Sequence, residues 1–348
     1  MSVAPIRVPI RWRLVATFAV AALVLASCGT ANVATIPRVN GTPARSISVP
    51  LTNVGCTLSD FCVAVGTSSA SVGPTSVVEF VTPSGHWFPL APPATVSPLV
   101  TSTACTKTQC LVGGSQPGHD LLWRFSAVGH TLADATPPPG GIGIDALTCE
   151  ELNCALVDTS VVSATPRLSL SADGGLTWTE PVDMAWARGD AITSLACGAV
   201  FDCVVSALTA HHEVSLYATR DGGTTWSQRT TPTTWTTLTS ISCDNLRCVA
   251  LANVTGSSKL VRTSNLGKSW TSASLKQESN ALACTKLTSC VIVGQLVNAK
   301  AWLATTSAGT TTNVSLRYVP TPLLDVACGT KRCAAIGVTT LLSVPAPR

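Results

Sequence analysis

Cysteines are the most regularly spaced reactive side chains in this chain of 348 residues. Cys28 stands alone near the N-terminus, and the remaining cysteines form seven close pairs with four or five residues between partners. The pairs are Cys56/Cys62, Cys105/Cys110, Cys149/Cys154, Cys197/Cys203, Cys243/Cys248, Cys284/Cys290 and Cys328/Cys333. Such pairs favour local disulfides formed in an oxidising compartment. Two alternatives are seven pairs of reduced, buried thiols, and zinc half-sites, although zinc usually takes a shorter gap.

The segment before Cys28 has the features of a bacterial export signal. Three arginines precede an apolar run, residues 14–26, that is short for a membrane span. The run ends in Leu25-Ala26-Ser27-Cys28-Gly29, which resembles the lipobox of bacterial lipoproteins. The resemblance implies that residues 1–27 are removed and that a lipid on Cys28 holds the protein at the outer face of the cytoplasmic membrane, with residues 28–43 as a tether. The alternative is a plain signal peptide with a chance cysteine.

Composition and charge bear on the fold and on nucleic-acid binding. Charged residues make up 11% of the chain, which suits short strands and tight turns better than long helices. Without Arg7, Arg11 and Arg13 of the export signal, 19 basic residues remain against 18 acidic ones. No basic cluster is left to neutralise a row of phosphates, so the sequence argues against nucleic-acid binding.

The cysteine pairs mark a repeat with a mean period of about 45 residues, typical of propeller blades of four strands each. Each first cysteine follows a small residue, with an apolar residue or Thr103 one place earlier, and each second cysteine precedes an apolar burst, so the two should bracket a hairpin. The sequence therefore predicts an all-β, seven-bladed β-propeller of four-stranded antiparallel blades over residues 44–348. The seventh repeat ends early, after one strand in Thr339 to Val344. Residues 44–50 are predicted to supply the missing outer strand and close the ring.

Three turns share a second motif, which spans Ser171 to Trp178, Thr219 to Trp226 and Thr263 to Trp270. They resemble the Asp-box of sialidases and many other propellers, which implies a structural cap between the outer two strands of a blade, with Trp on the fourth strand. The residues concerned are Asp173, Gly175, Trp178, Asp221, Gly223, Trp226, Asn265, Gly267 and Trp270. The acid or amide can accept turn amides, glycine takes a positive φ and Trp packs in the sheet stack. A calcium loop is the alternative, but each turn supplies at most one carboxylate.

The catalytic residues of sialidases do not carry over. The nearest match to their first arginine motif is Ile36-Pro37-Arg38, in the wrong order and inside the tether, and Tyr217 and Tyr318 are the two available tyrosines. No nucleophile elbow, phosphate loop or dinucleotide motif is present, and we expect no cofactor and no metal site.

A few other polar groups have side chains that could form a site. The run His211-His212-Glu213 is predicted to be a solvated hairpin tip, because neighbours on a strand point to opposite faces. Glu150 and Glu151 are expected to be exposed turn charges. Asp145 and Asp325, on inner strands, are expected either to line a small polar site in the central channel or to form its solvated walls.

In blade count, box motif and lipid anchor the chain resembles the photosystem II assembly factors, which implies the fold without transferring binding residues. The leading hypothesis is a monomeric, non-catalytic scaffold outside the cytoplasm that binds a protein or a cell-wall glycan through loops at one end. The alternatives are a divergent sialidase-like glycoside hydrolase or lyase, and a structural envelope protein without a dedicated ligand. Clustered carboxylates or arginines in the channel would favour an enzyme, whereas Ser, Thr and Ala would not.

Overall fold

The computed structural model describes residues 45–46, 49–70, 73–93, 98–198, 201–275, 277–296, 298, 300–307, 310–314, 319, 321–338 and 340–347. All of them belong to the compact unit Ile36–Arg348. The predicted export signal, Cys28 and the tether lie outside the described residues. Across the described part of the chain, no helix has the length and apolar character needed to cross a membrane.

The described residues form seven antiparallel sheets of four strands, as predicted. Blade 1 contains β2 (Asn53–Cys56), β3 (Cys62–Ala70), β4 (Gly73–Val81) and β5 (Trp87–Leu90); blade 2 contains β6 (Leu99–Cys105), β7 (Gln109–Gln116), β8 (His119–Ser126) and β9 (Thr131–Asp134). Blade 3 contains β10 (Gly141–Glu150), β11 (Asn153–Ser160), β12 (Pro166–Ser171) and β13 (Val182–Asp183); blade 4 contains β14 (Ala191–Cys197), β15 (Cys203–Leu208), β16 (Val214–Thr219) and β17 (Ser227–Arg229).

The remaining blades repeat the pattern. Blade 5 contains β18 (Thr237–Asp244), β19 (Arg247–Val254), β20 (Ser257–Thr263) and β21 (Thr271–Leu275); blade 6 contains β22 (Glu278–Lys286), β23 (Ser289–Gln295), β24 (Ala301–Ser307) and β25 (Thr310–Val314). Blade 7 contains β26 (Leu323–Cys328), β27 (Arg332–Gly337), β28 (Thr340–Pro345) and β1 (Arg45–Ser46). A short 3-10 helix, η1 (Ala185–Ala187), joins blades 3 and 4.

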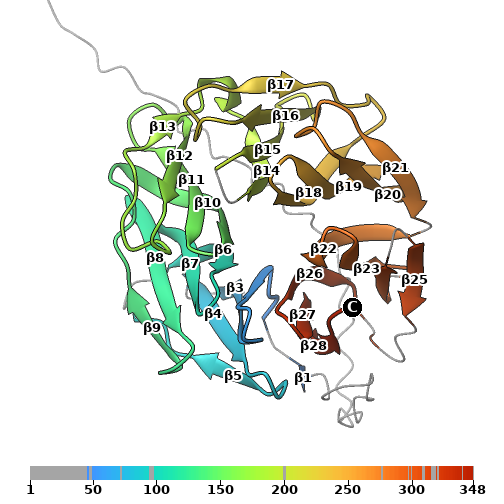
Figure 1. Cartoon of the computed structure of the whole chain (residues 1–348). Helices are drawn as coiled ribbons and strands as arrows, with labels where there is room; N and C mark the ends of the chain where they lie inside the picture. Colours follow the sequence, from blue (N-terminus) through green and yellow to red (C-terminus); the bar gives the residue numbers. More distant parts are fainter. Residues whose placement is uncertain are drawn as a thin grey trace, which may run out of the picture. The chain divides into compact units, whose positions relative to one another are not determined.

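The first strand of each blade contacts the first strand of the next, and β2 contacts β26, so the blades form a closed ring (Figure 1). The apolar position two residues before each first cysteine is buried in every blade, Thr103 of blade 2 included. Each second strand is also buried, as in β3, where Val63, Ala64 and Val65 are fully inaccessible. The core therefore lies between neighbouring blades, where the inner strands of one sheet pack on the next.

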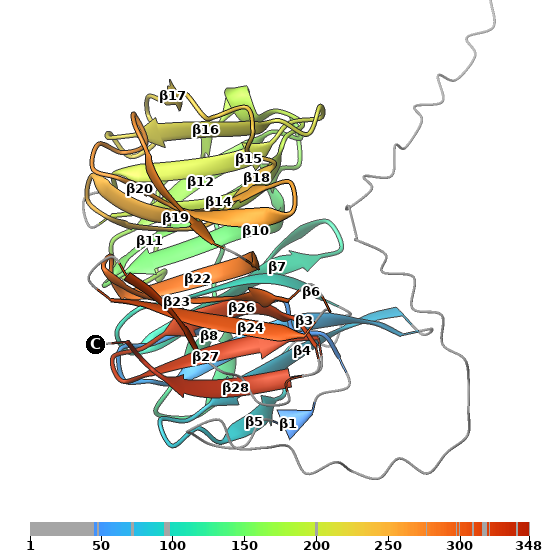
Figure 2. The same cartoon turned by 90° about the vertical axis from the view of Figure 1, so that its right-hand side faces the viewer.

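The ring is closed by the N-terminal strand, as predicted. Strand β1 pairs antiparallel with β28, with Arg45 opposite Leu341 and Ser46 opposite Thr340, and both views show the two strands side by side (Figures 1 and 2). Because β1 covers the open edge of blade 7, that blade gains its fourth strand from the opposite end of the chain.

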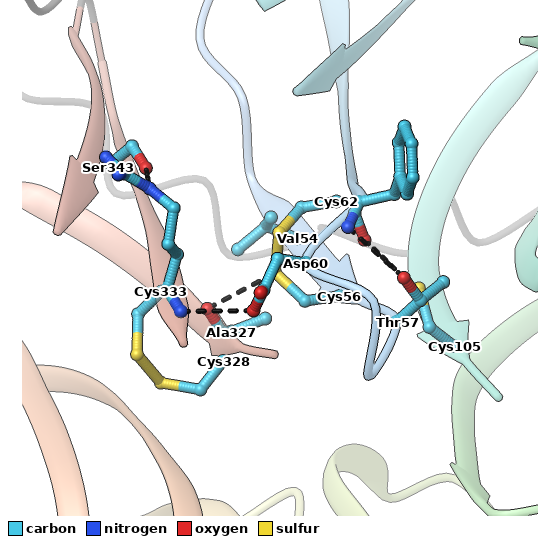
Figure 3. The surroundings of a disulfide bond; sticks show 12 residues. Val54, Cys56, Thr57, Asp60, Cys62, Cys105, Ala327, Cys328, Cys333 and Ser343 are labelled. Carbon is cyan, nitrogen blue, oxygen red and sulfur yellow. Dashed lines mark hydrogen bonds between the residues drawn. A yellow bond between two sulfur atoms is a disulfide. The ribbon is translucent and has the colours of Figure 1, made fainter. Parts of the chain in front are cut away.

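A second link closes the same junction near the cysteine hairpins. Asp60, 7% exposed, accepts hydrogen bonds from the amides of Lys331 (2.8 Å) and Arg332 (3.0 Å). Figure 3 shows Asp60 facing the hairpin that Cys328 and Cys333 join. The hydroxyl of Thr330 donates to the carbonyl of Leu58. One carboxylate thus holds the blade 7 hairpin against the blade 1 hairpin.

All seven predicted disulfides are formed, each between residues directly opposite one another on the first two strands of a blade. The sulfurs also pack against the preceding blade. The Sγ of Cys56 lies 3.3 Å from the carbonyl oxygen of Ala327 (Figure 3), and a Cβ added to Gly55 would lie 3.0 Å from the Sγ of Cys105. This contact explains why a small residue precedes each first cysteine.

The sequence did not distinguish the two cysteines of a pair, but the structure does. The second cysteine starts the second strand, which neighbouring blades cover, and in five blades it has no accessible surface. These fully buried residues are Cys110, Cys154, Cys203, Cys290 and Cys333. Cys110, Cys154, Cys290 and Cys333 belong to the apolar cores of their blades. The predicted structural role of these cysteines is therefore confirmed, and their burial adds that they are core residues that no ligand can reach.

Candidate functional site

The first cysteines of all seven pairs line one cavity of about 640 Å³ on the axis of the ring. It opens among the hairpins that join the first and second strands, which we call the cysteine end. Six charged residues line it: Lys107, Glu150, Glu151, Asp244, Arg247 and Lys286. Since these residues lie in or beside the loops between paired cysteines, equivalent positions of four blades converge on the same space.

Four of the six charges neutralise one another. Lys107 Nζ lies 2.7 Å from Glu151 Oε1, and Arg247 Nη2 lies 2.5 Å from Asp244 Oδ2. Glu150, at the end of β10, keeps its Oε2 buried without a hydrogen-bond partner. Lys286, at the end of β22, is exposed and has no ion-pair partner among the residues that the structure describes. The cavity therefore contains one carboxyl group, that of Glu150, and one ammonium group, that of Lys286, without an ion-pair partner among the described residues.

The environment of Glu150 differs from the exposed turn predicted for it. Its side chain is half-buried, and burial raises the pKa of its carboxyl group, with the negative charges of Asp244 and Glu151 adding to the rise. Glu151 is exposed, as expected. The prediction was wrong for Glu150 because a turn that is exposed in an isolated hairpin faces the other hairpins once the ring closes.

The rest of the cavity wall is mainly sulfur, aliphatic and small polar groups, including Leu58, Ile241 and Leu287. The five histidines of the chain all lie among the described residues, and none lines this cavity. Over the same residues, no group of three metal-binding side chains comes together. Such a wall can bind a ligand with an apolar middle and charged ends.

The structure does not bring Asp145 and Asp325 together in this cavity. Asp145 is exposed on β10 and accepts a hydrogen bond from the Thr159 hydroxyl at 2.8 Å. Asp325 accepts the Val54 amide of blade 1 at 2.8 Å and the Val326 amide at 2.9 Å, while burial raises the pKa of its carboxyl group to about 7. Asp325 is therefore a further link between blades 7 and 1, which the sequence did not indicate.

His211, His212 and Glu213 are exposed in the turn between β15 and β16, as predicted, at the end of the ring opposite the cysteine hairpins. Tyr217 stacks on Trp186, with ring centroids 3.7 Å apart, and does not line the cavity. Tyr318 and the Ile36-Pro37-Arg38 segment lie outside the described residues.

The three Trp-containing turns, which we call the box turns, follow the third strands of blades 3, 4 and 5 at the cysteine end. In blade 3, Asp173 Oδ1 accepts the amides of Leu176 and Thr177 at 2.9 Å, and the Ser171 hydroxyl accepts the Gly175 amide at 2.8 Å. Burial opposes ionisation of Asp173, but hydrogen bonds from Thr177, Ser171 and the Leu176 amide lower its pKa to about 2. The Asp173 carboxylate therefore makes these hydrogen bonds within its own turn.

The other two box turns repeat these bonds. Asp221 accepts the Thr225 amide at 2.8 Å and the Thr225 hydroxyl at 2.6 Å. In blade 5, Asn265 accepts the Ser269 amide at 3.0 Å, and its amide nitrogen donates to the Ser269 hydroxyl, so the bond to the side chain runs in the reverse direction. The exchange of Asp for Asn therefore keeps the turn intact.

Each box turn packs on the preceding blade. Gly175, at φ +83°, leaves no space for a Cβ beside Leu111 of blade 2, and the equivalent glycines, Gly223 and Gly267, face Leu168 and Leu216. Trp178, Trp226 and Trp270 pack in the cores shared with those blades. They stand before the fourth strands, which begin at Val182, Ser227 and Thr271, and not within them as predicted. Each Trp ring packs between its own blade and the preceding one.

A second charged cluster, which we call the Asp–Asp–Arg cluster, lies between blades 2 and 3 and was not foreseen. Arg167 binds Asp158 through Nε at 2.8 Å and Nη2 at 2.7 Å, both side chains being almost fully buried. Asp120 of β8, 3% exposed, packs on Gly141 and faces Asp158. Neither Asp120 oxygen has a hydrogen-bond donor in good geometry among the described residues.

The pKa of Asp120 follows from this environment. Burial raises it to about 8, and the negative charge of the neighbouring Asp158 adds to the rise, while Gly143 and the positive charge of Arg167 oppose it. Asp120 is therefore protonated at neutral pH and can donate its proton to Asp158. One arginine serves two carboxyl groups, and one proton balances the remaining charge.

No protein-family model and no curated protein sequence matches the chain. Solved structures match its fold. A structure of YCF48, a photosystem II assembly factor, bound to D1 peptide has 14% identity and a TM-score of 0.60, covering 88% of this chain and 98% of that one. An inactive virginiamycin B lyase from Staphylococcus aureus with quinupristin has 8% identity and a TM-score of 0.61, over 86% and 97%. A chain of the mitotic checkpoint complex has 12% identity and a TM-score of 0.61, over 93% and 99%. At these identities the likeness establishes the β-propeller fold.

Proposed function

We propose that this protein is a non-catalytic scaffold outside the cytoplasm that binds a protein or a cell-wall glycan through the loops at its cysteine end. The observation that carries the proposal is the axial cavity, where hairpins from every blade converge on charged groups that the fold leaves unpaired. Similar propellers have been solved with a D1 peptide and within the mitotic checkpoint complex, which supports a protein partner. The disulfides fit an oxidising compartment.

The proposal includes attachment to the outer face of the bacterial cytoplasmic membrane through a lipid on Cys28, with the propeller as a monomer. A cell fractionation comparing wild type with Cys28→Ala tests the attachment. The wild-type protein should sediment with membranes and enter detergent extracts, whereas the variant should be in the soluble extracytoplasmic fraction. Equal membrane association of both would overturn the lipid attachment while leaving the binding proposal intact.

Site-specific crosslinking in intact cells tests the binding proposal. A photoreactive amino acid at Leu58, which lines the cavity and is 52% exposed, should trap a defined partner. The matched control is the same amino acid at Val162, which is 92% exposed in a turn at the opposite end. Mass spectrometry then identifies the adducts. Adducts shared by both positions, or none at Leu58, would contradict binding at the cysteine end, and the latter result would favour a purely structural role in the envelope.

A glycoside hydrolase or lyase is the second candidate, favoured by the carboxylates in the cavity. Glu150, with its raised pKa, has the property of a general acid, and Asp244 and Glu151 are carboxylates near it. If the protein is such an enzyme, Glu150→Gln should reduce release of soluble fragments from purified cell-wall glycan at least about 100-fold. If the wild type releases no more fragments than a protein-free control, the enzyme candidate is excluded and the scaffold proposal remains.

A further inference from the structure

Glu150 and Lys286 stand on widely separated sides of the axial cavity. Glu150 belongs to blade 3 and Lys286 to blade 6, three blades apart in a ring of seven. The other lining charges form the pairs Lys107–Glu151 and Arg247–Asp244. A ligand that enters the cavity therefore meets a free carboxyl group on one side and a free ammonium group on another.

The volume of the cavity limits what can connect these two groups. A sphere of about 640 Å³ is about 11 Å across, which corresponds to roughly three extended residues at about 3.4 Å each. The volume also falls within the range of sites for small ligands. A single amino acid is too short to reach both groups, because its ammonium and carboxylate groups are attached to the same carbon atom.

The wall between the two charges suits a peptide backbone. Thr148, Ser242 and Thr285 supply polar groups, while the disulfides, Ala196 and Ile241 supply apolar contact. Burial raises the pKa of the Glu150 carboxyl group, and repulsion from the negative charges of Asp244 and Glu151 adds to the rise. An ammonium group placed there relieves that repulsion.

We propose that the axial cavity binds a short peptide of about three residues through both of its charged ends, with the ammonium group at Glu150 and the carboxylate at Lys286. This inference rests on the proposed function and specifies the chemistry of the ligand: a free peptide, or a partner segment with opposite charges at that separation.

Calorimetric titration of the full chain with triglycine tests the inference. N-acetyl-triglycine lacks the ammonium group, and triglycine amide lacks the carboxylate. The wild type should bind triglycine at least about ten-fold more tightly than either blocked peptide, since a hydrogen bond to a charged group contributes that much or more. Glu150→Gln should weaken triglycine binding by a similar factor and bind triglycine and N-acetyl-triglycine equally well. Lys286→Gln should likewise cease to distinguish triglycine from its amide.

Glu213→Gln is the matched control, because Glu213 is an exposed carboxylate at the opposite end of the ring. It should bind triglycine like the wild type, and thermal melting should show that all three variants are folded. Equal binding of triglycine and both blocked peptides, unchanged binding by Glu150→Gln, or no heat of binding at millimolar triglycine would each overturn the inference. A partner trapped at Leu58 despite such a result would leave the scaffold proposal standing, so the two failures are distinguishable.

Discussion

The Asp–Asp–Arg cluster predicts that Asp120→Asn stabilises the protein. At neutral pH the unfolded chain carries Asp120 as a carboxylate, since its ordinary pKa is 3.8, whereas the folded chain holds it protonated, with a pKa of about 8. Folding at pH 7 therefore requires uptake of one proton. At about 1.4 kcal/mol per pH unit, this uptake opposes folding by up to about 4 kcal/mol. Asparagine is neutral in both states, and its amide can donate to Asp158 in place of the proton.

The sign of the pH dependence follows from the raised pKa. Between about pH 4 and pH 8 the folded state binds one proton more than the unfolded state, so this group makes stability fall as pH rises. Asp120→Asn should remove that slope. The variant and the wild type should be about equally stable near pH 4, and the variant should be more stable by roughly 1 to 4 kcal/mol at pH 7.

Guanidinium unfolding under non-reducing conditions, followed by Trp fluorescence at several pH values, measures the difference. Asp134→Asn, at an exposed carboxylate on β9, is the neutral control. Asp158→Asn should destabilise by about 3 to 5 kcal/mol, because it leaves Arg167 buried without its partner. If Asp120→Asn proves less stable than the wild type at pH 7 with an unchanged pH slope, Asp120 is ionised in the folded protein and the argument is refuted.

Three further predictions concern how the blades are held. Replacing Cys243 and Cys248 by alanine should lower the unfolding free energy by about 2 kcal/mol, measured in guanidinium, because their disulfide closes a loop of few residues; no change would contradict the entropic argument. Asp221→Ala should lower the unfolding free energy by the same measurement, because the amide of Thr225 loses its acceptor, whereas Asp221→Asn should be nearly neutral, since Asn265 performs the same role in blade 5. Asp60→Ala removes the acceptor of the Lys331 and Arg332 amides at the ring junction and should speed amide hydrogen exchange in β1 and β28 before that in the other blades; uniform exchange would show that the junction is no weak point.

The blade pattern could be predicted because it is local. Each cysteine pair brackets its own hairpin, and the column of small residues before Cys56 and its equivalents follows directly from the crowding of inner strands. The early end of the seventh repeat likewise predicted a strand supplied by the N-terminus. The hydrogen bonds of Asp173 to the amides of Leu176 and Thr177 are also local, and the box motif predicted them.

Contacts between blades could not be predicted in the same way. Glu150 was expected in solvent because its neighbours in the cavity come from hairpins about a hundred residues away, such as that of Asp244. Asp120 and Asp158 meet because β8 and β11 lie in adjacent sheets, and the sequence of either strand gives no sign of the other carboxylate. The unequal burial of paired cysteines, such as half-buried Cys105 and fully buried Cys110, arises in the same way from neighbouring sheets.

Part of the candidate site could still have been found from the sequence. Aligning the repeats and marking charged residues between paired cysteines would have identified Lys107, Glu150, Arg247 and Lys286 as candidates for one site. Their convergence follows once a ring of blades is assumed, because equivalent hairpins then point to the same axis.

The local pairing of the cysteines bears on how the chain can oxidise correctly. Fourteen cysteines can combine in on the order of 10⁵ ways, by the count that gives 105 for eight. Here every correct partner is the next cysteine along the chain beyond Cys28, five or six residues away. Each pair can therefore join as soon as its own hairpin forms, before any later blade exists and without waiting for the ring. Reshuffling by an isomerase is then unnecessary for a chain that oxidises in order from its N-terminus.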